Sequence, residues 1–105
     1  MFLQVIKSER NVEDINIKNA KRIAQTIKKL YPVATIYITG SVLKPHLVHP
    51  GSDIDIVTMN IEEKNYEALI KHIRLKFPSL NADIRRMEEL DSYLKHKVMN
   101  KGYLV

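Results

Sequence analysis

The sequence predicts one small α/β (α+β) domain in which a mixed β-sheet is covered by helices on one face. Three short runs of β-branched and alternating apolar residues predict strands, and the stretches beside them repeat apolar residues at helical spacing. A chain of 105 residues is long enough for one hydrophobic core but not for two, so we expect a single domain over residues 1–105. The expected order of elements is helix, strand, turn, strand, helix, strand, helix.

The first half of the chain is predicted to hold one helix and one strand. The helix begins near Val12 or Asp14 and ends at Leu30, because the apolar residues follow amphipathic spacing and Pro32 disfavours helical geometry in the residue before it. Residues 34–39 are rich in β-branched and aromatic side chains and therefore predict a strand.

The second half is predicted to hold two strands and two helices. Alternating polar and apolar residues predict strands at 52–59 and 80–86. Between them, Asn60 offers an N-cap and Glu63 completes a capping-box arrangement at the start of the second helix. The last helix is expected from about Glu88 to Met99.

An Asp-x-Asp pair lies on the second predicted strand. Asp53 and Asp55 alternate with Ile54 and Ile56, so both carboxylates share one face of the strand and both isoleucines enter the core. The Cα atoms of the two aspartates would lie about 7 Å apart. Like charges on one face repel each other unless a cation neutralises them, and hard oxygen ligands of this kind suit Mg²⁺. Taken alone, the pair is better explained by an edge strand with a solvated acidic face.

A Gly-Ser pair at the end of the first predicted strand favours the metal-binding interpretation of the two aspartates over the solvated acidic face. Gly40 lets the backbone turn sharply and lets a ligand approach closely. Ser41 is a good N-cap for a short helical turn that Pro45 limits in length, and the free N–H groups at such a start bind phosphate. A phosphate-binding turn followed by a metal-binding Asp pair is a much more specific combination than either feature by itself.

The Gly-Ser and Asp-x-Asp motifs, separated by eleven residues, resemble those of the minimal nucleotidyltransferases of the DNA polymerase β superfamily. Members carry a third acidic residue on a neighbouring strand, which Asp83 matches best, and a final helix with a Gly-aromatic tail, which residues 87–104 resemble. The resemblance runs from about residue 16 onward and implies the nucleotidyltransferase (polymerase β-like) fold. Many members have an arginine directly after Gly-Ser, where Val42 stands here, and Lys44 is the candidate to replace it.

The resemblance also implies the chemistry: a Mg²⁺-dependent nucleotidyltransferase that moves a nucleoside monophosphate, AMP from ATP, to a hydroxyl acceptor. Two Mg²⁺ ions would be held by the three carboxylates, and the triphosphate by the Gly-Ser turn and its neighbours. The expected catalytic and metal-binding residues are Asp53, Asp55 and Asp83, and the expected nucleotide-binding residues are Gly40, Ser41, Lys44 and Ser52.

The resemblance says more about the acceptor than the residues do. Members of this size are often the antitoxin of a toxin–antitoxin system and silence a HEPN ribonuclease toxin by AMPylation of a tyrosine, so we expect that role and that partner. Two alternatives stay open: transfer to a small molecule such as an aminoglycoside, and a catalytically weak or inactive module that neutralises its partner by complex formation. Val42 keeps the second alternative open, whereas the three aspartates favour catalysis.

Composition excludes some other classes. The formal charge of +5 comes largely from the solvated face of the first helix, and no aromatic residues are interleaved there for base stacking, so we do not expect direct nucleic-acid binding. The chain has no cysteine, which suits a cytoplasmic protein, and no apolar run approaches the roughly 20 residues that span a bilayer. The sequence leaves the oligomeric state open, a homo-oligomer included.

Three other side chains share the sheet face of Asp83 in the predicted strands. Arg85 is equally suited to bind phosphate or to form a salt bridge with an aspartate of the site. Tyr37 and Thr39 are expected to pack.

Overall fold

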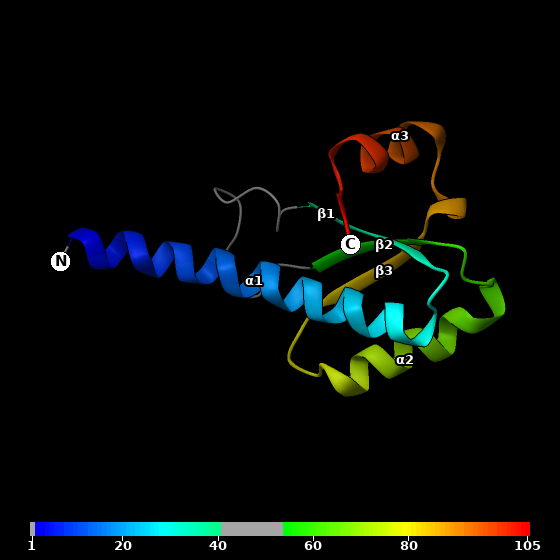
Figure 1. Ribbon diagram of the computed structural model, residues 1–105, viewed down its shortest axis with the longest axis horizontal. Coiled ribbons are helices and arrows are strands. Elements are labelled where there is room, and N and C mark those ends of the chain that lie inside the picture. The colour runs from blue at the N-terminus through cyan, green and yellow to red at the C-terminus, as the bar shows by residue number, and fades with distance from the viewer. Residues whose placement is uncertain (1, 41–53) are drawn as a thin grey trace.

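The computed structural model describes residues 2–40 and 54–105, with side chains described from residue 16 onward within these ranges. Three α-helices and a four-stranded sheet make up this part of the chain. Figure 1 shows how the helices lie around the sheet. The helices are α1 (Phe2–Leu30), α2 (Tyr66–Lys76) and α3 (Ser92–Lys101), the short 3₁₀ helices are η3 (Glu63–Asn65) and η4 (Met87–Glu89), and the strands are β1 (Thr35–Thr39), β2 (Ile54–Met59), β3 (Ala82–Arg86) and β4 (Tyr103–Leu104). Within the described ranges, no helix is both long and apolar enough to cross a membrane.

The sheet is mixed, as predicted. Its strand order is β3-β2-β1-β4; β1 pairs antiparallel with β2 and with β4, whereas β2 and β3 are parallel and are joined through α2. The edge strand β4 was not among the expected strands, because its two residues are too few to show an alternating pattern.

The larger core lies between one face of the sheet and the helices α1 and α2. Alternate strand residues enter it, so Ile36 and Ile38 of β1 meet Ile54 and Ile56 of β2, and Ile84 of β3 joins them. Helix α1 covers this layer with Ile23 and Ile27, and α2 with Leu69 and Ile73. In Figure 1 both helices lie on the same side of the sheet, which agrees with the predicted cover on one face.

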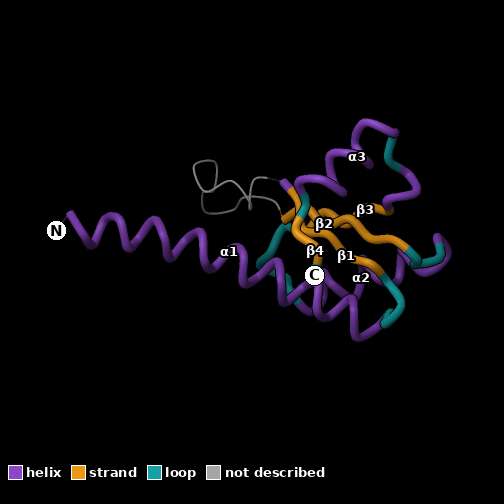
Figure 2. The backbone as a smooth tube through the Cα atoms, turned by 45° about the horizontal axis from the view of Figure 1, so that its top comes forward, coloured by secondary structure: helices purple, strands orange, loops and turns teal. Residues whose placement is uncertain are grey.

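The last helix lies on the opposite face, together with η4, which is a departure from the expected arrangement. A smaller core forms there from Val57 of β2, Met87 of η4 and Val98 of α3, with Tyr37 packed against it. Figures 1 and 2 both show α3 across the sheet from α1 and α2. Of the described helices, α3 and η4 cover this face of the sheet.

The helix starts differ from the predicted ones. Asn60 adopts φ 67° and makes a left-handed turn after β2 in place of the expected N-cap, so α2 begins only at Tyr66, after η3. The last helix starts at Ser92 because the side chain of Asp91 accepts a 2.8 Å hydrogen bond from the Leu94 N–H and caps it. Helix α1 starts at Phe2, ten residues or more before the expected position.

Candidate active site

Two acidic residues and a threonine form a row across three strands. Thr39 of β1 pairs with Asp55 of β2, and Asp55 pairs in turn with Asp83 of β3. Paired residues on neighbouring strands point to the same face, and neighbouring strands lie about 4.8 Å apart. The carboxylates of Asp55 and Asp83 therefore emerge side by side, on the face that carries α3.

Gly40 follows directly after this row and lies against one of its carboxylates. Its φ of 83° is in the left-handed region that favours glycine. A β-carbon at this position would overlap Oδ2 of Asp55 and approach its Cγ to 3.1 Å. The close approach that the sequence predicted for a ligand is thus made, in this structure, by the carboxylate of Asp55.

Arg85 forms an ion pair with Asp83, which is one of its two expected roles. The Arg85 Nε donates to Asp83 Oδ2 at 3.1 Å, and the side chains are 59% and 46% exposed. An ion pair as exposed as this contributes about 0–1 kcal/mol to stability. Its main consequence is local: the guanidinium orients the Asp83 carboxylate and offsets part of the negative charge beside Asp55.

A cavity of about 240 Å³ lies over the row of polar residues. Thr39, Asp55, Asp83 and Arg85 form its polar side, and its apolar side comes from Val57 of β2, Leu90, and Leu94 and Val98 of α3; Ile56, whose side chain lies in the larger core, also borders it. Thr39 therefore lines the site, whereas Tyr37 packs in the smaller core as expected. The contribution of α3 was not predicted, because the sequence did not indicate that this helix crosses to the sheet face of the aspartates.

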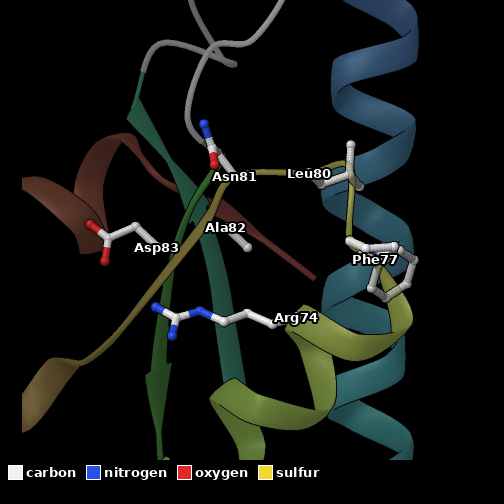
Figure 3. A pocket seen from close by; sticks show the side chains of 7 residues that line it. Arg74, Phe77, Leu80, Asn81, Ala82 and Asp83 are labelled. Carbon is white, nitrogen blue, oxygen red and sulfur yellow. The ribbon is translucent and has the colours of Figure 1, made fainter.

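Two further hollows adjoin this cavity. One, of about 190 Å³, lies beyond Thr39 and Gly40 and is lined by Lys97 and Lys101 of α3. The other, of about 600 Å³, lies at the start of β3 and is shown in Figure 3, where Arg74 reaches toward β3 and Asp83 points away from Phe77. We place the candidate site in the cavity of 240 Å³ because both carboxylates line it, whereas only Asp83 reaches the larger hollow.

The remaining candidate residues lie outside the described residues. These are Ser41, Lys44, Ser52 and Asp53, so their places in the site stay predictions. Within residues 2–40 and 54–105, no group of three or more acidic or histidine side chains could hold a metal ion. Asp55 and Asp83 are the two members of the predicted acidic set that the structure brings together.

Comparison with known families identifies the general class of the chain. A family model described as a nucleotidyltransferase domain matches residues 20–105. The chain belongs to the nucleotidyltransferase domain family. A comparison with curated proteins finds no matching relative.

The match to the nucleotidyltransferase domain fixes the general class of the protein. It spans β1, β2 and β3 and so includes Gly40, Asp55 and Asp83. The four-stranded mixed sheet and its helices fit the polymerase β-like fold of this family. The protein is therefore a transferase of the nucleotidyl-transferring kind, as the sequence predicted.

Proposed function

We propose that this nucleotidyltransferase domain moves AMP from ATP to a hydroxyl acceptor with the help of Mg²⁺, and that the acceptor is a tyrosine of a HEPN toxin for which it serves as antitoxin. The observation that carries the proposal is the in-register placement of Asp55 and Asp83 on adjacent parallel strands, beside the left-handed Gly40. A surface that only binds a partner has no need of two carboxylates converging on one cavity.

The donor set fits a hard divalent cation. Asp55 and Asp83 present carboxylate oxygens to one cavity from neighbouring strands, and these are the ligands that Mg²⁺ prefers in proteins. Together with Asp53 they would hold the metal. When bound, Mg²⁺ neutralises charge on the transferring phosphoryl group and on the leaving oxygen.

The protein's own groups then have separate tasks. Asp83 is half-exposed at the edge of the cavity, where its carboxylate can accept the proton of the acceptor hydroxyl. The hydroxyl oxygen bonds to the α-phosphorus, the bond to the bridging oxygen breaks, and pyrophosphate leaves. Arg85 keeps the Asp83 carboxylate oriented, and the turn at Gly40 receives the phosphates.

The shape of the site favours a protruding acceptor. The cavity has a volume of about 240 Å³. Pockets that enclose a drug-sized ligand usually have volumes of about 300–1,000 Å³, so this cavity is smaller than most of them. Asp83 is 46% exposed, so a hydroxyl can reach it from outside. A tyrosine on the loop of a partner protein meets both conditions, because most of its surface stays with the partner.

The test is intact-mass spectrometry of a candidate helical toxin, such as the product of the neighbouring gene, after incubation with this protein, ATP and Mg²⁺. We expect a mass gain of one or more AMP units, and none with Asp83→Asn, which should still form the complex. Toxin neutralised in a tight complex without any mass change would contradict the proposal and favour the binding-only alternative. Transfer to a free aminoglycoside but not to the protein would favour the small-molecule alternative.

A further inference from the structure

Two lysines of α3 face the end of β1 across a hollow. Lys97 and Lys101 are four residues apart and therefore lie on one side of the helix. Together with Thr39 and Gly40 they line the hollow of about 190 Å³. This hollow shares Thr39, Leu94 and Val98 with the cavity of the aspartates, so the two spaces lie next to each other.

The charge in this hollow is not neutralised by the described part of the chain. Both lysines are exposed, and no carboxylate among residues 16–40 and 54–105 forms an ion pair with either of them. The two neighbouring spaces thus present acidic side chains at Asp55 and Asp83 and basic side chains at Lys97 and Lys101. A ligand that matches this pattern binds metal at one end and carries several negative charges at the other.

We propose that Lys97 and Lys101 form a polyphosphate subsite that holds the β- and γ-phosphates of the nucleoside triphosphate and then the pyrophosphate product. The proposal rests on the nucleotidyl transfer proposed above and names residues for it that the motifs do not contain. Lysine ammonium groups bind phosphate oxygens through charge-assisted hydrogen bonds. They supply positive charge beside the Gly40 turn in a chain that has Val42, an uncharged residue, after its Gly-Ser pair.

The subsite predicts selectivity for triphosphates. In the proposed arrangement, a monophosphate with its phosphorus near Asp55 and Asp83 has no further phosphate for the lysines to bind, whereas ATP and inorganic tripolyphosphate do have further phosphates. Substitution of both lysines should therefore lower the affinity for ATP and tripolyphosphate and leave the affinity for AMP unchanged. A purely structural role is different, since cations near the C-terminal end of a helix stabilise its dipole whether or not nucleotide is bound.

The experiment is titration calorimetry of the full chain with ATP, tripolyphosphate and AMP, each with Mg²⁺. The test variant is Lys97→Gln/Lys101→Gln, and the control is Lys95→Gln, which lies two residues from Lys97 and so roughly 200° around the same helix. We expect the test variant to lose at least about tenfold in affinity for ATP and tripolyphosphate, and less than about twofold for AMP. Lys95→Gln should bind all three as wild type does, and Lys97→Arg/Lys101→Arg should retain ATP binding.

Each outcome decides a different point. An unchanged ATP affinity in the double variant, with or without a lower Tm, overturns the subsite but leaves the proposed transfer intact. An equal loss of ATP affinity in Lys95→Gln also overturns the subsite, because the effect would then come from the overall positive charge of the protein and not from these two positions. If wild type binds neither ATP nor tripolyphosphate, the subsite and the proposed function both fail. If the double variant does not fold, the single variant Lys97→Gln is measured in its place and judged by the same criteria. Lys97 is chosen because it lies inside α3, whereas Lys101 is the last residue of the helix.

Discussion

Substituting Gly40 should separate the geometry of the site from the stability of the fold. Gly40→Ala keeps a small side chain but places it at φ 83°, which costs about 1–2 kcal/mol for a residue with a β-carbon. For a chain of this size, each kcal/mol lowers Tm by roughly 4–8 °C. The new β-carbon would also overlap Oδ2 of Asp55, whose side chain can relieve the overlap by rotating its carboxylate away from the cavity. We therefore expect a moderate loss of stability and a severe loss of metal binding.

The assay is thermal unfolding with and without Mg²⁺ or Mn²⁺, and again with ATP present. A cation that binds only the folded state at about 100 times its Kd adds about 2.7 kcal/mol, and Gly40→Ala should lose this gain to the same extent as Asp55→Asn. A variant with both Gly40→Ala and Asp55→Asn should lose no more of the metal-induced gain than either single variant, because both changes act through the carboxylate of Asp55.

Asn60→Ala is a matched control for this experiment. Asn60 also has a positive φ, of 67°, and lies after β2, outside the residues that line the site. Its substitution should lower Tm through backbone strain while the metal-induced rise of Tm persists. A full metal-induced rise in Gly40→Ala, or its loss in Asn60→Ala as well, would refute the argument from Gly40.

Two other predictions concern hydrogen bonding and titration. Ser41→Ala should weaken ATP binding by roughly one hydrogen bond to a charged group, about 1.5–3 kcal/mol, and unchanged affinity in calorimetry would remove Ser41 from the phosphate site. Burial, and secondarily the charge of Glu88, raises the pKa of the Tyr66 hydroxyl well above its ordinary value near 10. The native state then holds this proton where the unfolded chain releases it, so stability is intact below about pH 10 and falls as pH rises further. In urea unfolding, Tyr66→Phe should show a shallower fall than wild type between pH 9 and about pH 11; equal slopes would contradict this.

Local sequence patterns predicted the strands that carry the site better than the helices around it. Alternation of apolar and polar residues is a local property, and it gave β1 at 34–39 against the observed Thr35–Thr39, and the third strand at 80–86 against Ala82–Arg86. The helix start at Asn60 was wrong because the capping-box pattern there also suits a left-handed turn after a strand. The observed start at Tyr66 goes with tertiary packing, since Tyr66 and Leu69 are both buried in the core.

The lining of the site by α3 could not be predicted in the same way. Leu94 and Val98 are apolar at helical spacing, which indicates a buried side but not which layer of the protein buries it. The choice depends on Val57 and Met87, which leave an apolar patch on the sheet face opposite the larger core. Such a patch is visible only once strand pairing is known. Lys97 and Lys101 of the same helix were for that reason not among the candidate residues.

The position of Asp83 depends on strand register more than on its own surroundings. Successive side chains alternate between faces, so a slip of one residue between β2 and β3 would carry Asp83 to the face of α1 and α2. The register is held by Ile84, which must stay in the larger core, and by the Ile54 N–H, which donates to the carbonyl of Asn81 at 2.7 Å. Burial of an isoleucine contributes about 1.5–3 kcal/mol, whereas the exposed pair between Asp83 and Arg85 contributes at most about 1 kcal/mol. The carboxylates are therefore brought together by apolar packing on the opposite face of the sheet, and not by attraction within the site, where their charges repel each other.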